Sequence, residues 1–336
     1  MTIAIKALRD DIHRILIGRG VPADEAAIGV DMCIDAELRG HSSHGVRLLR
    51  NVLVEYANGE SRRAPVRVLH ETPVSAQLDG GFHLSWSVHR TAVDIAAEKA
   101  AETGIAIVSV RNAGVSGALG NLVERVAARG LVALAMNSSP LTVVAPGAAT
   151  PTLGTNPLAV GVPRASGSPL VLDMATSAIA FNQVMRLRDN GAELPVGVAV
   201  DAAGAPTIDP ASAIDPDTGR GRVLPFGGHR GYGLALMLEL LVSAAVTGRV
   251  AEDKRGRVVL EPADFSAVYI AYQPGLIGDP GAGYAATDRL VQDLIDQGAR
   301  IPGEFSRARR EACLRNRTVD LDAAATQLLA SLSGAP

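Results

Sequence analysis

The sequence predicts an α/β protein, in the broad sense that includes α+β folds, with helical segments at both ends of the chain. Apolar residues recur at helical spacing over residues 3–38, where Pro22 separates two helices, and again over residues 46–57. The central region instead alternates compact β-branched runs with helical stretches. Helices are expected once more over residues 286–297 and 306–333.

The central region reads as a series of strands and helices. Short alternating segments over residues 66–85 predict strands, and residues 87–103 predict a helix. The β-branched run 105–110 leads into a glycine-rich turn, residues 112–120, and then another helix. A strand, a glycine-rich turn and a helix in this order predict a phosphate site, because the first N–H groups of a helix bind anions. Further strands are expected over residues 131–136, 158–162, 170–173 and 268–272.

Three later stretches are less regular. Residues 200–225 are rich in Asp, Pro and Gly, and a loop of that length indicates function or disorder. The apolar helix expected over residues 231–247 is short for a membrane span and is predicted to be buried. Residues 281–286 fit a loose GxGxxG pattern, but no strand runs directly into them. They are interpreted as a loop before a helix, so a Rossmann fingerprint is not assigned.

Composition narrows the class of protein. The chain has 336 residues, 47% of them apolar but only 3% aromatic, so a large core must consist mainly of Ala, Val and Leu. The net charge of −3 and the absence of a basic stripe argue against a nucleic-acid partner. The first residues lack the apolar stretch of a signal peptide, and the two cysteines lie far apart. A cytoplasmic protein without membrane attachment is expected.

Three short segments contain residue types suited to catalysis. Residues 41–45 read His-Ser-Ser-His-Gly, residues 172–177 read Leu-Asp-Met-Ala-Thr-Ser, and residues 225–234 read Pro-Phe-Gly-Gly-His-Arg-Gly-Tyr-Gly-Leu. An imidazole such as that of His44 titrates near neutral pH, so it suits proton transfer to a C=O or C=N group that receives a hydride. His41 and His44 have metal-ligand spacing, but no third ligand follows at a recognisable spacing, so no metal is expected.

Simpler structural interpretations exist for these residues. His44 suits a helix start or a loop, and Asp173 suits a helix N-cap. Thr155 belongs to a polar turn whose entry into a strand is fixed by Pro157. Arg230 fits equally a surface residue at a helix entry and a ligand for phosphate or carboxylate.

Together, in this order and spacing, the three segments resemble the malate/L-lactate dehydrogenase-like family of NAD(P)-dependent oxidoreductases. The resemblance covers about residues 5–330. It implies a non-Rossmann dinucleotide-binding domain with a mostly antiparallel mixed sheet, at about residues 73–284. A helical domain would combine residues 1–72 with about 285–336. The resemblance also implies a homodimer, a small-molecule substrate and NADH or NADPH as cofactor.

The resemblance assigns roles to individual residues. His44 would be the proton donor or acceptor, with Ser43 and Gln183 orienting it. The substrate would be held by Thr155 and an arginine, either Arg230 or one near His44. The arginines after Gly303 would either meet phosphates or lie on a solvated helix face. The cofactor contacts implied are Val115, Ser116, Gly117, Ala118, Leu119, Asp173, Met174, Ala175, Arg230 and Gly303.

The chain departs from the family four residues after the catalytic histidine. Family members usually carry an arginine there for the substrate carboxylate, and this chain has Leu48. Arg47 is adjacent, but one helical residue turns a side chain by about 100°, so it is no simple replacement. Arg50 is a further candidate.

Other departures lie at the cofactor turn and beside the histidine. The family's usual His-Phe is Val115-Ser116 here, which removes a polar and an aromatic contact. Gln183 stands where family members commonly have a charged residue, and the loss of an opposite charge lowers the expected pKa of the histidine. Arg230 replaces the family's usual lysine.

Two functional hypotheses follow. The first is an NAD(P)H-dependent oxidoreductase that transfers hydride to or from a C=O or C=N carbon of a hydroxy- or keto-acid-like compound or a cyclic imine. Its substrate would not be an ordinary 2-oxo acid such as pyruvate. The second is a scaffold whose redox activity has lapsed, serving as a non-redox lyase, isomerase or small-molecule binding protein.

Overall fold

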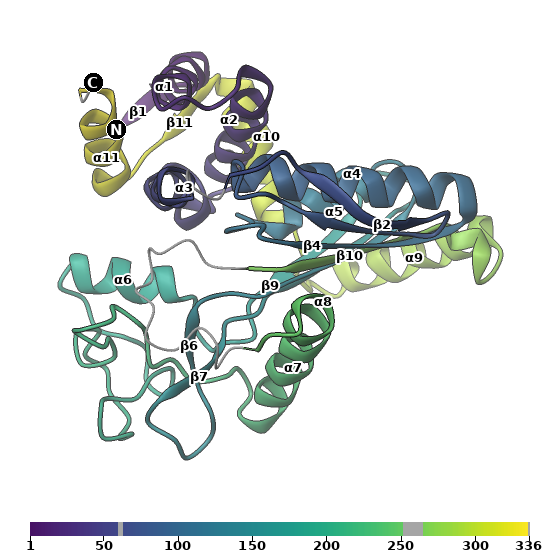
Figure 1. Cartoon of the computed structure of the whole chain (residues 1–336). Coiled ribbons are helices and arrows are strands. Elements are labelled where there is room, and N and C mark those ends of the chain that lie inside the picture. Colours follow the sequence, from purple (N-terminus) through teal and green to yellow (C-terminus); the bar gives the residue numbers. More distant parts are fainter. Residues whose placement is uncertain (60–62, 251–264, 335–336) are drawn as a thin grey trace.

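The computed structural model describes residues 1–59, 63–250 and 265–334. A helical part formed by both ends of the chain lies against one end of a large sheet (Figure 1). The helices are α1 (Ile5–Gly18), α2 (Ala23–Leu38), α3 (Val46–Asn58), α4 (Ser85–Thr103), α5 (Leu119–Ala127), α6 (Phe181–Asp189), α7 (His229–Glu239), α8 (Ala245–Thr247), α9 (Pro280–Asp296), α10 (Glu304–Asn316) and α11 (Ala323–Ser333). Shorter turns are η1 (Ser42–His44), the π-helical η3 (Leu240–Ala244) and η5 (Pro274–Leu276).

The central sheet has the strand order β2-β3-β4-β10-β5-β8-β9. Among the described strands of this sheet, β3 and β4 alone pair in parallel, so the sheet is mixed and mostly antiparallel, as predicted. Helices α4 and α5 cover one face, and α7 and α8 approach the other (Figure 1). The strands are β1 (Thr2–Ala4), β2 (Arg67–Thr72), β3 (Ser75–Asp79), β4 (Ile105–Arg111), β5 (Val132–Asn137), β6 (Leu141–Val144), β7 (Pro151–Gly154), β8 (Leu158–Val162), β9 (Leu170–Met174), β10 (Ala267–Tyr272) and β11 (Thr318–Asp320).

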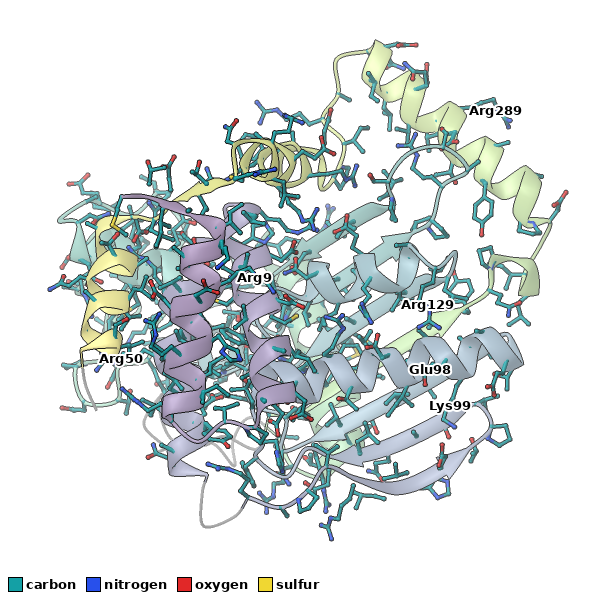
Figure 2. All side chains as sticks on the ribbon, turned by 90° about the horizontal axis from the view of Figure 1, so that it is seen from above. Arg9, Arg50, Glu98, Lys99, Arg129 and Arg289 are labelled. Atoms are coloured by element: carbon teal, nitrogen blue, oxygen red, sulfur yellow. The ribbon has the colours of Figure 1, made fainter. Side chains whose placement is uncertain are left out.

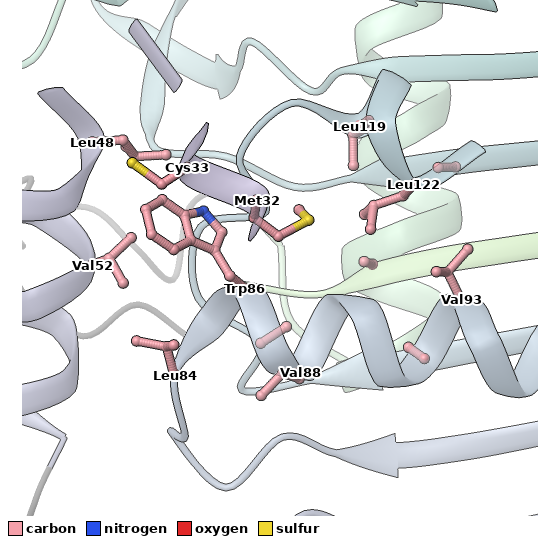
Figure 3. Packing of buried hydrophobic residues seen from close by; sticks show 14 of the residues in the cluster. Met32, Cys33, Leu48, Val52, Leu84, Trp86, Val88, Val93, Leu119 and Leu122 are labelled. Carbon is pink, nitrogen blue, oxygen red and sulfur yellow. The ribbon is translucent and has the colours of Figure 1, made fainter. Parts of the chain in front are cut away.

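The main core joins the helical part to the sheet. Trp86 of α4 is fully buried and packs among Cys33 of α2, Leu48 and Val52 of α3, and Leu84 (Figure 3). Most of the other buried side chains are Ala, Val and Leu, which agrees with the low aromatic content. Close packing of these side chains fixes how α3, and the turn before it, sit relative to the sheet.

The two ends of the chain pair with each other. Strands β1 and β11 are antiparallel, with Ile3 opposite Val319. The helix pair expected over residues 306–333 is therefore interrupted by a strand, which begins after Arg317 ends α10 in a left-handed conformation (φ 57°). A three-residue strand has too little alternation to be recognised locally, and its partner lies at the other end of the chain.

Several elements lie outside the predicted boundaries. Strand β2 pairs with β3, so residues 67–72 belong to the sheet, although the expected division placed them with the terminal helices. Helix α9 runs beside the sheet and apart from α1, α2 and α11 (Figures 1 and 2). The interpretation of residues 281–286 as a loop was wrong, because they form the start of α9, where Asp279 accepts a hydrogen bond from Gly281 N (2.9 Å).

The apolar helix expected over residues 231–247 starts at His229 and contains the π-helical turn η3. By length and composition, His229–Thr247 could cross a membrane, a property that core helices of soluble proteins share. The prediction that it is buried was wrong in part. Only 33% of its most apolar 18-residue stretch is buried, and the side chains of Met237, Leu240 and Leu241 are 42–56% exposed. This exposed apolar face is available for contact with another surface.

Candidate active site

His44 lies in the short turn η1 that joins α2 to α3. Gly45 is required after it, because a Cβ there would lie 2.3 Å from Glu37 Oε1. The same carboxyl oxygen accepts a hydrogen bond from Val46 N at 2.7 Å. Glu37 therefore anchors the start of α3 and, with it, the histidine turn. Burial raises the pKa of Glu37 to about 7, although the Val46 N–H opposes that shift.

The His44 ring is held on one nitrogen by its neighbour. Ser43 Oγ lies 2.8 Å from His44 Nδ1, so Nε2 is the nitrogen left for a ligand in either tautomer. Burial lowers the pKa of His44 to about 4, with a smaller contribution from nearby His41. The imidazole is thus neutral at pH 7 in the ligand-free protein. A cluster of three or more potential metal ligands does not occur within the described ranges.

Helix α6 contacts the histidine turn, although the two segments lie far apart in the sequence. Asn182 Nδ2 donates to Ser43 O at 3.2 Å. The next residue, Gln183, is exposed, although the family resemblance implies that it orients His44. The two residues are one helical position apart, so their side chains diverge by about 100°. In this structure Asn182, rather than Gln183, connects α6 to the catalytic candidate.

Arg47 and Leu48, beside and at the position expected to hold a substrate carboxylate, are both engaged in other contacts. Arg47 is paired with Asp322, the N-cap residue of α11, with Nε 2.9 Å from Oδ2. Leu48 is 6% exposed and packs in the core beside Cys33 (Figure 3). Arg50 is exposed on the outer side of α3, near α11 (Figure 2). Each of the three residues thus has another role: Arg47 pairs with an acid, Leu48 packs in the core and Arg50 faces solvent.

The glycine-rich turn connects to β9 at the start of α5. Gly120 N donates to Asp173 Oδ2 at 2.7 Å. The helix N-cap interpretation of Asp173 was wrong, because this residue lies inside strand β9 and its carboxylate meets the N-terminus of a different helix. Ser116 Oγ accepts a hydrogen bond from Asn137 Nδ2 at 2.9 Å. A phosphate bound at this turn would share the backbone N–H groups of the turn with the Asp173 carboxylate.

Buried groups behind the turn hold its backbone. Val115 N donates to Glu55 Oε2 at 3.2 Å, and burial raises the pKa of Glu55 to about 7. His89 Nε2 lies 3.0 Å from Gly114 O, which can only accept, so Nδ1 accepts from the Tyr269 hydroxyl at 2.5 Å. Burial lowers the pKa of His89 to about 4, which agrees with this neutral ring. The turn is therefore shaped without the family's His-Phe pair.

Polar atoms of α5 and α10 fit a polyanionic ligand, although the Arg309 side chain packs against Gly40, where a Cβ would lie 3.0 Å from its Nε. Gly303, at the start of α10, packs on β9, where a Cβ would lie 3.1 Å from Val171 O. Both side-chain amide atoms of Asn121 and the Nε atoms of Arg307 and Arg309 are buried without a hydrogen-bond partner. Arg307 Nε lies 3.9 Å from Glu124 Oε1, one helical turn after Asn121. Basic groups and unpaired donors beside a helix N-terminus suit the phosphates of a dinucleotide.

Backbone hydrogen bonds join Thr155 to the segment after β9 and, through it, to the segment before α7. Thr176 N donates to Thr155 O at 2.9 Å, and Phe226 N donates to Thr176 O at 3.1 Å. The latter bond brings the glycine-rich segment before α7 to the strand end that carries Met174 and Ala175. Arg230 is exposed in the first turn of α7. Since α6 begins five residues after Thr176 and reaches Ser43, all the candidate segments converge on one region.

Sequence reasoning missed the residues that support the site from behind. They are Glu37, Glu55, His89, Asn137 and Asn182. Glu37 in α2 and Glu55 in α3 each follow an apolar residue, Ile34 and Val52, by three positions, so both can face the core. These are signals that could have been used, because a buried carboxyl requires a hydrogen-bond partner.

The mixed α/β fold and the site on which the candidate segments converge are those of an enzyme. Comparison with known proteins identifies its class. Residues 3–330 match the family model for malate/L-lactate dehydrogenase. A Delta(1)-pyrroline-2-carboxylate/Delta(1)-piperideine-2-carboxylate reductase of Pseudomonas syringae pv. tomato is 36% identical over 74% of this chain and 71% of its own length. An L-sulfolactate dehydrogenase of Methanothermobacter thermautotrophicus is 30% identical over 88% and 85%.

A solved structure of a related protein has the same fold as this chain. The crystal structure of delta1-piperideine-2-carboxylate reductase from Pseudomonas syringae matches with a TM-score of 0.87 and 31% identity, covering 99% of each chain. The chain belongs to the malate/L-lactate dehydrogenase family. It is accordingly an NAD(P)-dependent oxidoreductase.

Proposed function

We propose that His44 transfers the proton that accompanies hydride transfer to or from a C=O or C=N carbon. The observation that carries this proposal is the 2.8 Å contact of Ser43 Oγ with His44 Nδ1, which leaves Nε2 for the reacting oxygen or nitrogen. In reduction His44 would donate a proton, and in oxidation the neutral ring would accept one. The bound dinucleotide supplies or receives the hydride.

Thr155 and Arg230 are proposed to hold the substrate. Thr155 shares a backbone hydrogen bond with Thr176, and the segment leading to Arg230 is bonded to the same residue. A guanidinium suits a carboxylate because its N–H groups match both oxygens. Arg230 is favoured over Arg47, whose guanidinium is paired with Asp322.

The dinucleotide is proposed to bind along the start of α5. The residues that would hold it are those of the turn 115–119, Asp173 to Ala175, and Gly303, which the contacts among α5, β9 and α10 support. Asp173 is an exposed residue whose carboxylate accepts from Gly120 N and whose pKa burial raises to about 6, and it suits ribose hydroxyls. The Nε donors of Arg307 and Arg309 suit phosphates. We infer a non-Rossmann cofactor domain centred on the seven-stranded sheet, with NADH and NADPH both as candidates.

The proposed substrate is a bulkier or less acidic ketone, or a cyclic imine, rather than pyruvate. Leu48 stands where the resemblance expects a carboxylate-binding arginine, and the structure packs it in the core. Relatives named as cyclic-imine reductases and as a sulfolactate dehydrogenase show that the family covers both chemistries.

The first experiment is a fluorescence titration of the purified protein with NADH and NADPH, followed by a panel of keto acids and cyclic imines. We expect micromolar binding of one reduced dinucleotide and its oxidation by a member of the panel other than pyruvate or oxaloacetate. Failure to bind either dinucleotide would favour the lapsed-redox alternative. Pyruvate or oxaloacetate as the best substrate would contradict the proposed specificity.

We also propose a cytoplasmic homodimer. The exposed apolar face of His229–Thr247 supports the dimer, since monomers seldom leave such a surface uncovered. An apolar helix that lies against a second copy needs no membrane.

A further inference from the structure

The apolar helix α7 contains a single acidic residue, Glu239, and its side chain is 2% exposed. Glu239 Oε2 accepts a hydrogen bond from Asn156 Nδ2 at 2.9 Å. Asn156 is itself fully buried, and its Nδ2 also donates to Ala235 O at 3.2 Å. Buried polar groups of this kind are retained where they are hydrogen-bonded, and here they tie the helix to the residue that follows Thr155.

The contacts continue from Asn156 to Thr155 through Ser139. Asn156 Oδ1 accepts from Ser139 N at 3.2 Å, and Asn156 N donates to Ser139 Oγ at 3.0 Å. Ser139 Oγ lies 3.0 Å from Thr155 Oγ1. Either hydroxyl can donate this bond. Because Ser139 Oγ already accepts from Asn156 N, donation by Ser139 to Thr155 Oγ1 is the arrangement that leaves the proton of Thr155 for a ligand.

A second route connects the same helix to the same loop. The π-helical turn η3 follows Glu239 directly, and its Val242 O accepts from Ser266 Oγ at 2.9 Å. Ser266 then pairs with Ser138, which donates from N to Ser266 O (2.9 Å) and accepts at Oγ from Ser266 N (3.0 Å). Helix α7 and its π turn thus hold the Ser138-Ser139 loop at two points. π-Helical turns within α-helices occur frequently at functional sites.

We propose that Glu239 is a positioning residue for substrate binding, which acts through Asn156 and Ser139 to present the Thr155 hydroxyl as a hydrogen-bond donor. The substrate class follows: it carries an acceptor oxygen, of a carboxylate or a carbonyl, at the place that Thr155 faces. The inference rests on the proposed function, because it takes Thr155 as a substrate contact.

The kinetic test compares Glu239→Leu with Glu239→Gln. Leucine removes one of the two acceptors of Asn156 Nδ2 and leaves only Ala235 O, and we expect KM for the substrate to rise about 10-fold or more, the effect of one lost buried hydrogen bond. The dissociation constant of the dinucleotide should stay unchanged. Glutamine keeps an acceptor oxygen and should restore KM. Ser243→Ala is the matched control, because Ser243 is equally buried one turn later and its hydroxyl has no hydrogen-bond partner.

A second variant reaches the same contacts from the other side. In Gly154→Ala the new Cβ would lie 2.5 Å from both Asn156 Oδ1 and Ser139 Oγ. We expect the same rise in KM, which keeps the inference testable if Glu239→Leu does not fold. An unchanged KM in either folded variant would overturn the inference, as would equal losses of substrate and dinucleotide affinity.

Amide hydrogen exchange provides a readout that needs no turnover. Ser139 N–H is bonded to Asn156 Oδ1, so its exchange should accelerate in Glu239→Leu and stay slow in Glu239→Gln and Ser243→Ala. Faster exchange in a protein that oxidises no NAD(P)H with any substrate would contradict the proposed function and leave the hydrogen-bonded route intact. Unaltered exchange in Glu239→Leu would overturn the route itself.

Discussion

At the scale of the residue, burial decides the protonation state of the catalytic candidate. Among the described residues no carboxylate pairs with His44, and burial lowers its pKa to about 4. The neutral Gln183 does not compensate, because it is exposed and because an amide carries no charge. The imidazole is therefore set as a proton acceptor at neutral pH, and its use as a donor becomes less favourable as the pH rises.

The pH dependence of the two reaction directions should differ accordingly. Since kcat/KM reports the free enzyme, its reductive value should fall about 10-fold per pH unit above the pKa of about 4, as the protonated fraction of His44 declines. Its oxidative value should stay level over the same range.

His44→Ala should lower turnover in both directions by about 10²-fold or more. Near-normal turnover of this variant, with dinucleotide affinity intact, would remove His44 from the role.

At the scale of the element, the turn η1 depends on the helix before it and the helix after it. Glu37 near the end of α2 binds Val46 N at the start of α3, and Gly45 leaves just enough space for its carboxyl group. Asn182 of α6 holds the Ser43 carbonyl from the far side. The position of His44 is thus set by three helices rather than by its own segment.

Gly45→Ala should disturb this arrangement. The Cβ would overlap Glu37 Oε1 at 2.3 Å, so the buried carboxyl must move away from Val46 N. We expect a loss of about 1–3 kcal/mol in the free energy of unfolding, and reduced turnover with unchanged dinucleotide binding. Urea unfolding and steady-state kinetics measure both. Gly18→Ala is the control, because a Cβ there meets nothing within 4 Å; equal stability of the two variants would contradict the argument.

At the scale of the whole molecule, the helix His229–Thr247 relates the site to the outer surface. Its inner side holds Asn156 through Glu239, and its outer side exposes Met237, Leu240 and Leu241. A second copy that covers the outer side would also stabilise the inner contacts, because both belong to one helix.

Leu241→Asp therefore tests the proposed dimer. Leu241 is 56% exposed, so the variant should fold, but a charge at this position would be desolvated in the interface. Size-exclusion chromatography with light scattering should show a dimer for the wild type and a monomer for Leu241→Asp. Val196→Asp, at an 87% exposed position, should remain dimeric. A monomeric wild-type protein would refute the dimer.

The sequence by itself determined the features that depend on neighbours along the chain. Helical periodicity and Pro22 placed α1 and α2, and β-branched runs placed β4 and β8 at nearly their observed ends. The three motif segments identified the family that residues 3–330 match. These patterns are local, so they can be recognised before the chain is folded.

Only the tertiary structure decided which side chains meet. It paired Arg47 with Asp322, placed Leu48 beside Trp86, brought Asn182 rather than Gln183 to Ser43, and set Asp173 against Gly120. These contacts join residues that lie far apart in the sequence, and a shift of one helical position exchanges a buried partner for a solvent-exposed one. The periodicity of apolar residues along a helix does not predict which of two neighbouring positions faces a given partner, because the packing of the whole core decides it.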